Sequence, residues 1–252
     1  NSGHFPWRND PDPGAIMAAQ GPLARSAADL ELLFDVLCAP DGLDGRAWRI
    51  ELPAPRFDRL AACRIGILQL PAWIPVEQAI LDAQQALGDA LAQRGAVVRA
   101  VDLSQHFGDL SEYYRHYLTH LQCVLRAKAA AKMRTYDDPF LGAVADGLEG
   151  HASLMLEMLQ ASLRHRAAWE SVFEDVDVLL SPVCNVNAFP HDDAFFYDRK
   201  LLINGATYPY YRLSAIPALA SLAGLPATVF PTGRSASTGA PIGLQAMGRY
   251  LD

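Results

Sequence analysis

Hydrophobic residues follow a strand-like, then a helical, then a strand-like pattern over residues 63–103. Residues 63–70 and 96–103 are short apolar runs typical of buried strands. Residues 76–94, between them, repeat apolar positions at helical spacing. Strand, helix and strand with short links form a βαβ unit, so we expect parallel neighbouring strands with a right-handed crossover. The first strand-to-helix turn lacks G-x-G-x-x-G, which argues against dinucleotide binding.

The rest of the chain carries two longer helical patterns and three more strand-like runs. Residues 110–133 and 151–173 are expected to be helices. Residues 176–180 are apolar throughout, as in a strand covered on both faces. Near the C-terminus, residues 226–231 and 241–248 flank a loop of small and polar residues, which favours an antiparallel pair.

Shorter signals complete the expected fold. Ser26 begins a helix with Asp29 in capping-box position, and residues 213–223 form a helix that ends at Gly224. Residues 48–52 alternate as in an edge strand. Together the elements predict an α/β fold, with a mixed, largely parallel sheet and helices on both faces.

Gln245 is a lone amide in the apolar run near the C-terminus. A buried amide must find hydrogen-bond partners, at a cost of roughly 1–3 kcal/mol if it fails. Gly243 on the same strand face lets a backbone or a ligand come close. A structural role, with a neighbouring loop satisfying the amide, and a role beside a ligand are both open.

Three segments carry a family resemblance. Residues 219–233 read LASLAGLPATVFPTG and residues 239–250 read GAPIGLQAMGRY; QGPLARSAADLELLFDVL covers residues 20–37, and DVLLSPV covers residues 177–183. In this order they resemble the amidase signature family, whose members typically carry "AGLPA … P.G … G.P.G.Q..G", "GPxARSVxDLxxxxxVL" and "DxLLxPT". The ordered set spans most of the chain.

The resemblance implies amide hydrolysis by a Ser nucleophile, a second Ser in a cis peptide and a Lys base. In the family both serines lie in a Gly/Ser-rich stretch upstream of the GPxARS segment, and the Lys lies earlier. This chain begins at Asn1 without Met, has no such stretch, and contains only Lys128, Lys132 and Lys200. We therefore expect residues 1–252 to be the C-terminal part of a single amidase-like α/β domain, ending just before a last helix. No catalytic residue is assigned, and the chain alone is expected to be inactive.

The expected substrate cleft lies where the strand 176–180 ends. Ends of neighbouring parallel strands gather at one sheet edge, where pockets form, and the resemblance places the LLxP turn beside the catalytic Ser. The residues expected to bind substrate are Ser181, Pro182, Val183, Ile216 and Leu219. Since Pro217 follows Ile216, we expect Ile216 to be extended, with its side chain free to project. Alternatively, this turn packs under the rest of the domain and touches no ligand.

Two polar clusters invite a metal or acid–base interpretation. One face of the expected helix carries Glu112, His116 and His120. Successive side chains on that face are separated by about 5.4 Å along the helix axis, so the three do not easily converge on one ion. The polar flank of a partly exposed helix is therefore favoured. His191 stands beside two acids in a loop, where local hydrogen bonding is favoured. Ser235 has Gly233 before it but no Gly two residues after it, so it does not fit a nucleophile elbow. No metal or organic cofactor is expected.

The composition restricts the classes of molecule that this protein is expected to bind. The net charge is −7 and the pI about 5.4, which argues against nucleic acid and membrane surfaces. Four widely spaced cysteines, Cys38, Cys63, Cys123 and Cys184, are typical of free, buried thiols in a cytoplasmic protein. The expected partner is a small-molecule amide, and a homo-oligomer is compatible with the sequence. Two alternatives stay open: an amidotransferase A-type subunit that works in a complex, or a non-catalytic remnant that binds a ligand.

Overall fold

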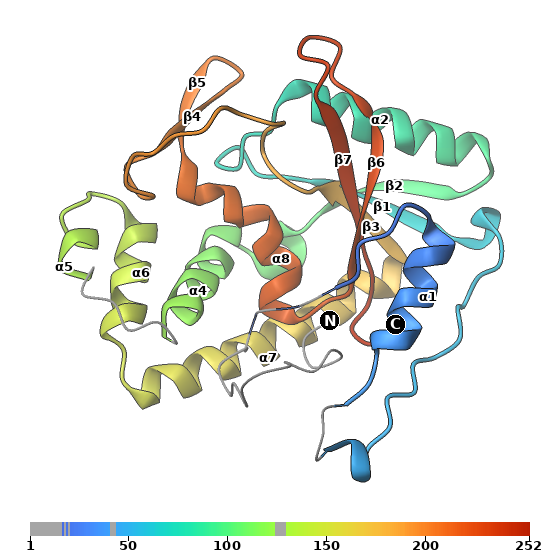
Figure 1. The fold of residues 1–252 in the computed structure, drawn as a ribbon, viewed down its shortest axis with the longest axis horizontal. Helices are drawn as coiled ribbons and strands as arrows, with labels where there is room; N and C mark the ends of the chain where they lie inside the picture. Colours follow the sequence, from blue (N-terminus) through green and yellow to red (C-terminus); the bar gives the residue numbers. More distant parts are fainter. Residues whose placement is uncertain (1–16, 18, 20, 41–43, 124–129) are drawn as a thin grey trace.

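The computed structural model describes residues 17, 19, 21–40, 44–123 and 130–252. Its main sheet has the strand order β2-β1-β3-β7-β6 (Figure 1). The strands are β1 Arg64–Gln69, β2 Val97–Asp102, β3 Val178–Pro182, β6 Ala227–Arg234 and β7 Pro241–Met247. β1 pairs parallel with β2 and β3, whereas β7 pairs antiparallel with β3 and β6. In this sheet only β7 runs against the others, so the mixed, largely parallel arrangement is confirmed.

The βαβ prediction is confirmed. Helix α2, Gln78–Gln93, connects β1 to β2, and Arg64 of β1 lies opposite Val97 of β2 in a parallel ladder. Ile80, in the apolar stripe of α2, is buried. Gly88, on the same helix, leaves room for the neighbouring strand: a Cβ there would lie 3.3 Å from Ile67 Cδ1.

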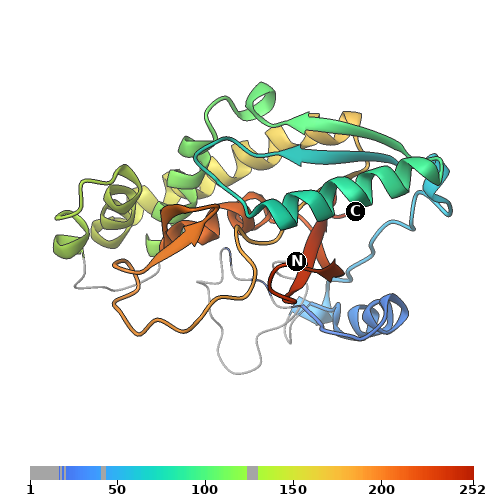
Figure 2. The same cartoon turned by 90° about the horizontal axis from the view of Figure 1, so that it is seen from above.

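The two faces of the sheet bury different residues of the same strands, as alternation requires. Ile65, Ile67 and Leu180 form a cluster with side chains of α2. Leu68 and Leu179 point the other way and pack with Trp169 and Phe173 of α7, Ala152–Asp175. Figure 2 shows α2 and α7 on opposite sides of the sheet, so helices cover both faces as predicted.

Further helices complete the fold. They are α3 Ser104–Phe107, α4 Leu110–Cys123, α5 Ala130–Met133, α6 Pro139–Glu149 and α8 Ala215–Ala223, with 3-10 turns η1 Asp44–Arg46, η2 Leu60–Ala62 and η3 Tyr210–Ser214. Of these, α3, α4 and α8 pack against α7. Tyr113 of α4 joins that helix to α8 and α7: its Oη donates to Leu219 O of α8 at 2.7 Å and accepts from Trp169 Nε1 of α7 at 3.2 Å. A fully buried hydroxyl is thereby satisfied. Among the described residues, no helix has the length and apolar character needed to cross a membrane.

The predicted helix ends need several corrections. The helix expected over 110–133 is described as α4 and α5, and residues 124–129 between them lie outside the described residues. The sequence analysis missed α6, although Asp138 and Pro139 are typical N-cap and N1 residues; Asp138 Oδ1 accepts from Phe140 N at 2.9 Å. The predicted edge strand at 48–52 is wrong: these residues form no ladder, and Trp48 is 68% exposed.

Helix α1, Ala27–Leu37, confirms the predicted cap, because Asp29 N donates to Ser26 Oγ at 3.1 Å. None of its residues is buried, however. Leu32, Leu33 and Val36 are among its exposed apolar side chains. Within the described residues, this side of α1 is therefore left exposed, whereas Leu30 and Phe34 are half-buried.

A small hairpin was also missed. Strands β4, Lys200–Ile203, and β5, Ala206–Pro209, pair antiparallel around Asn204 and Gly205. Both turn residues have positive φ, 50° and 84°. Asn-Gly is the strongest two-residue hairpin signal because both residues tolerate that conformation. The sequence therefore contains the hairpin signal, in a stretch for which the sequence analysis predicts no regular structure.

Two histidines of α4 form side-chain hydrogen bonds with residues of α7. His116 Nδ1 lies 2.9 Å from His165 Nε2, and His120 Nδ1 lies 3.1 Å from Ser162 Oγ. Burial, with the nearby His116 and Arg164, lowers the pKa of His165 to about 4. Burial also lowers the pKa of His116, against the opposing effect of Glu112. The folded protein thus favours neutral imidazoles at this helix interface.

We expect the stability of the protein to fall as the pH drops from about 6.5 to about 4. In that window the unfolded chain binds protons at its ordinary histidine pKa while His165 in the folded chain stays neutral, so protonation favours unfolding. Urea unfolding at several pH values measures this. His165→Gln should flatten the dependence, whereas His151→Gln, at an exposed site, should not. An identical pH dependence for wild type and His165→Gln would contradict the assignment.

Candidate functional site

The carboxyl end of β3 is fixed by a buried side-chain contact with β7. Ser181 and Gln245 lie opposite each other in the antiparallel ladder. Gln245 Nε2 donates to Ser181 Oγ at 2.9 Å and to Pro182 O at 3.2 Å, and Ser181 Oγ donates to Pro182 O at 3.0 Å. Ser181 and Gln245 are 0% and 5% exposed. The structural interpretation of Gln245 is therefore supported, but its partners belong to the end of strand β3 and not to a neighbouring loop.

The five residues predicted to bind substrate are mostly interior in the described structure. Ser181, Pro182, Ile216 and Leu219 are buried, and Val183 is half-buried. Ile216 packs in the cluster that contains residues of α4 and α6, and Leu219 packs in the cluster that contains residues of α7. None of the five lines the cavities described below. Contact of these residues with substrate stays a prediction.

The expectation that Ile216 is extended is wrong, because Ile216 is the second residue of α8. Pro217 follows it as the third residue. The first turn of a helix has no intrahelical partner for its N–H groups, so a proline there removes no hydrogen bond. That tolerance of Pro217 in the first turn outweighs the preference of the preceding residue for extended backbone.

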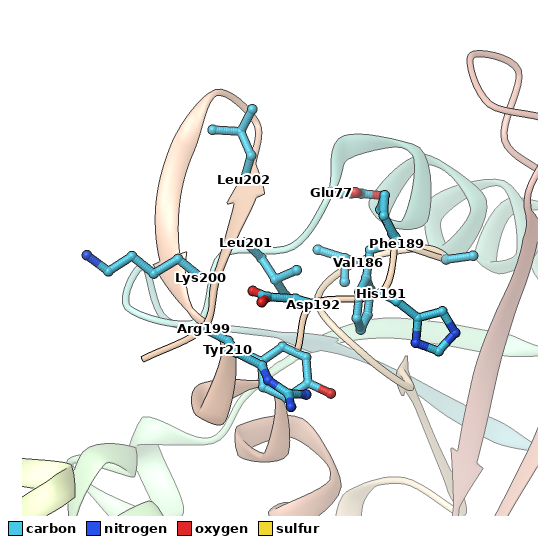
Figure 3. Close-up of a pocket in the computed structure, with 12 residues that line it drawn as sticks. Glu77, Val186, Phe189, His191, Asp192, Arg199, Lys200, Leu201, Leu202 and Tyr210 are labelled. Carbon is cyan, nitrogen blue, oxygen red and sulfur yellow. The ribbon is translucent and has the colours of Figure 1, made fainter. Parts of the chain in front are cut away.

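A cavity of about 690 Å³ lies just beyond the carboxyl end of β3 (Figure 3). Open α/β sheets bind ligands in crevices outside the carboxyl ends of their strands. The cavity is enclosed by the start of α2, the loop after β3 and the β4–β5 hairpin. Its lining residues are Glu77, Val186, Ala188, Phe189, Pro190, His191, Asp192, Arg199, Lys200, Leu201, Leu202 and Tyr210.

Hydrogen bonds to the N-terminus of α2 hold the loop after β3 in place. Glu77 N donates to Asn185 O at 2.8 Å, and Asn185 Nδ2 donates to Pro75 O at 2.6 Å. Asn187 donates through both its backbone N and its Nδ2 to Glu77 Oε2, at 3.1 and 2.8 Å. The first turn of α2 and this loop therefore form one connected unit.

The hairpin is attached to the same helix end. Asn204, at its tip, donates from Nδ2 to Val76 O at 2.8 Å and accepts from Gln78 N at 3.2 Å. The Gln78 N–H belongs to the first turn of α2, where backbone N–H groups have no intrahelical acceptor. A side chain 126 residues away thus supplies a cap for α2 and fixes one wall of the cavity.

An ion pair supports the opposite side of the cavity, behind Tyr210. Asp138 Oδ2 accepts from Tyr211 Oη at 2.6 Å and from Arg212 at 2.7 Å. Burial alone would raise the pKa of Asp138, but the bonds from Tyr211, Arg212 and Phe140 outweigh it and lower that pKa. The N-terminus of α6 is thereby tied to η3, which follows the hairpin.

A second cavity, of about 390 Å³, opens at the carboxyl end of β1. Gln69, Leu70, Ile74 and Gln84 are among its lining residues. Gln84 is buried, and its Nε2 donates to Leu180 O of β3 at 3.0 Å. Asn204 lines this cavity too, so the hairpin separates two hollows at the same edge of the sheet.

The polar patterns of the sequence do not form a catalytic or metal centre in the described residues. No group of three or more His, Cys, Asp and Glu there is placed to hold a metal ion. His116 and His120 bond to α7, and His120 is buried, which corrects the expectation of a polar flank on a partly exposed helix. Asp192 Oδ1 accepts from Ala194 N at 2.9 Å, which supports local hydrogen bonding in the loop with His191. Ser235 lies between two strands, and its Oγ bonds to Ser237 Oγ.

Among the lysines and cysteines that the structure describes, Lys200 alone lines one of the two cavities. Lys132 pairs with Asp198 at 3.2 Å, Lys200 begins β4 and lines the larger cavity, and Lys128 lies outside the described residues. Cys38, Cys63 and Cys184 are free but only partly buried, which corrects the expectation of buried thiols; the side chain of Cys123 lies outside the described set. Burial raises the pKa of both Cys38 and Cys63.

Sequence reasoning missed most of the cavity wall. The residues of β4 and the aromatic Tyr210 carry no motif of their own, although the Asn-Gly turn could have located the hairpin. Glu77 lies at the start of a helix whose only sequence signal is its apolar stripe. Nothing in the local pattern indicates that the start of α2 meets a loop about 110 residues later in the chain.

We expect Gln245→Leu to lower the free energy of unfolding by about 1–3 kcal/mol, because it leaves the buried Ser181 hydroxyl without its donor. Urea denaturation of the purified protein measures the loss. Gln160→Leu, at an exposed position on α7, is the matched control and should change stability by less than about 0.5 kcal/mol. Equal effects of the two substitutions would rule out the proposed role of the buried amide.

Comparison with known proteins gives a consistent result. A family model described as Amidase matches residues 3–252. An indoleacetamide hydrolase of Bradyrhizobium diazoefficiens is 28% identical over 246 residues, covering 94% of this chain and 44% of the relative. The A subunit of a glutamyl-tRNA(Gln) amidotransferase from Hyphomonas neptunium is 26% identical over 263 residues, covering 92% and 51%. The chain thus spans about half the length of the curated relatives that it matches.

Solved structures share the fold. The A subunit of the glutamyl-tRNA(Gln) amidotransferase from Thermotoga maritima superposes with a TM-score of 0.63 at 16% identity, over 92% of this chain and 49% of that one. A bacterial aryl acylamidase of the amidase signature group gives 0.60 at 19% identity, over 92% and 49%. At such identities the likeness concerns the fold.

Proposed function

This chain belongs to the amidase signature family, and from that premise we propose that the protein containing it is a serine-type amide hydrolase. It converts a carboxylic amide and water into an acid and ammonia or an amine. The observation that carries this proposal is the match of the Amidase model to residues 3–252. Among the relatives, an enzyme named for indoleacetamide hydrolysis supports a hydrolytic role.

In the proposed mechanism the nucleophile lies in a part of the protein upstream of this chain. By the family pattern, a serine attacks the carbonyl carbon, a second serine and a lysine move its proton, and backbone N–H groups bind the oxyanion. Such donors act because they are already aimed at the developing charge. The described residues supply no candidate for this set: Ser181 is bonded within the β3–β7 ladder, and Lys132 is paired with Asp198. The proposed chemistry needs no metal or organic cofactor.

The proposed contribution of this chain is a rigid wall at the carboxyl edge of the sheet. Val183 offers the substrate a half-buried apolar side chain directly after β3. Ser181, Pro182, Ile216 and Leu219 lie interior to it and keep this edge rigid. A wall of this composition suits a neutral acyl group, since burying an unpaired charge there would be costly.

The uncovered apolar side of α1 supports the proposal that residues 1–252 are the C-terminal part of a larger amidase domain. Leu32 and Val36 are 63% and 72% exposed. A helix with an apolar stripe normally buries it. The upstream half of the domain is the proposed cover. We also propose a cytoplasmic location, based on three free cysteines among the described residues.

The second candidate function is that of an amidotransferase A-type subunit in a complex. The observation that favours it is the relative with that name, at 26% identity. Copurification distinguishes the two: a subunit of this type should purify with partner chains, whereas a hydrolase should turn over amides without them. A protein that binds amides but hydrolyses none would instead be a non-catalytic remnant.

We expect the full-length protein to hydrolyse simple amides and to be labelled by an alkyl fluorophosphonate on a serine upstream of residue 1. Mass spectrometry of the labelled protein locates that serine. Ser181→Ala and Ser235→Ala should both remain labelled, because neither hydroxyl is the proposed nucleophile. Label on Ser181 or Ser235, or no turnover of any amide by the full-length protein, would refute the proposal.

We expect Val183→Trp in the full-length enzyme to lower kcat/KM for bulky acyl amides by roughly tenfold relative to acetamide, as a large ring fills the wall position. Val229→Trp is the control, because Val229 is 57% exposed on β6 and lies away from both cavities. Thermal unfolding confirms that both variants are folded. Unchanged relative kcat/KM for Val183→Trp would show that Val183 does not meet the acyl group.

A further inference from the structure

The cavity beyond β3 exposes apolar side chains at its mouth. Phe189 is 43% exposed and Leu202 is 68% exposed, and both belong to its lining. Tyr210 stands edge-on to Phe189, with ring centroids 5.7 Å apart at 83°. Tyr210 also meets Phe196 at 5.3 Å and 90°. Half-exposed aromatic rings around a hollow leave apolar surface that a ligand can bury.

Three charged groups of the same wall already have partners within the protein. Glu77 Oε2 accepts two hydrogen bonds from Asn187, and Asp192 Oδ1 accepts from Ala194 N. Arg199 Nε donates to Ala194 O at 2.7 Å, and its guanidinium lies 5.5 Å from the Tyr210 ring.

The lysine of the wall is oriented differently. Figure 3 shows Lys200 projecting away from the other lining side chains, whereas Leu201 lies beside Val186 and packs in the same hydrophobic cluster. The cavity lining therefore combines apolar and aromatic side chains with polar groups, of which Glu77, Asp192 and Arg199 are hydrogen-bonded within the protein.

We propose that this cavity binds a neutral aromatic group of the amide substrate. Its volume of about 690 Å³ accommodates a one- or two-ring group. The hydrogen bonds from Asn185, Asn187 and Asn204 to the start of α2 hold the walls in place, so little order has to be gained on binding. The inference rests on the proposed amide hydrolase function and names the substrate class that the site selects.

The test compares two phenylalanines of nearly equal exposure in the same loop. Phe189 lines the cavity, whereas Phe195, 44% exposed, does not line it. For the full-length enzyme, kcat/KM is measured with phenylacetamide and with acetamide. Phe189→Ala should reduce the phenylacetamide-to-acetamide ratio by roughly tenfold, since it removes a face of the aromatic site. Phe195→Ala should leave the ratio within about twofold of wild type.

A second measurement is independent of turnover. Calorimetric titration with 2-phenylethanol, a neutral aromatic compound with no amide bond to hydrolyse, should give weaker binding to Phe189→Ala than to wild type, and a Leu202→Asp variant should weaken it further by placing a charge at the mouth. If wild type and Phe189→Ala bind and discriminate equally, the aromatic site is refuted while amide hydrolysis stands. If wild type hydrolyses no amide but binds 2-phenylethanol through Phe189, the hydrolase function fails and the cavity assignment remains.

Discussion

The placement of β3 between a parallel and an antiparallel neighbour is the constraint on which the rest of the structure depends. At its start, Asp177 is 4% exposed and accepts from the backbone and the guanidinium of Arg64, both at 2.8 Å. At its end, Ser181 and Gln245 close the ladder with β7. A buried carboxylate and a buried amide each require these partners. The strand is thus fixed in register from both ends, and its carboxyl end can only emerge at one edge of the sheet.

Both cavities described above lie at that edge. The loop after β3, the hairpin β4–β5 and the start of α2 meet there, and asparagine side chains connect them. The first N–H groups of a helix need outside partners, and here the loop backbone and a hairpin residue use the same helix end. The N-terminus of α2 therefore holds two of the cavity walls in place.

In this structure, the buried polar groups that stabilise the fold are distinct from the surface that a ligand can reach. Ser181 is a hydroxyl at a strand end, a place where nucleophiles occur, yet its bonds make it a structural member of the ladder. Tyr113 and Asp138 are likewise satisfied by neighbours. In the described residues, these buried polar groups hold elements together, and the surface left for a ligand combines apolar, aromatic and charged side chains. This division fits a chain that provides a wall while another part of the protein supplies the nucleophile.

The sequence by itself determined the βαβ unit, the two C-terminal strands and the Ser26 cap, because periodicity and turn residues report local backbone preference. Its motifs, taken in order, indicated the family. It also contained the Asn204-Gly205 turn, whose hairpin the sequence analysis missed. Only the tertiary structure decided that Gln245 bonds to Ser181, that Asn204 caps α2 and that Phe189 and Tyr210 share a cavity. Periodicity shows which face of an element is buried but not which segment covers it. Partners 64 and 126 residues apart are chosen by sheet order and register, which no local pattern encodes.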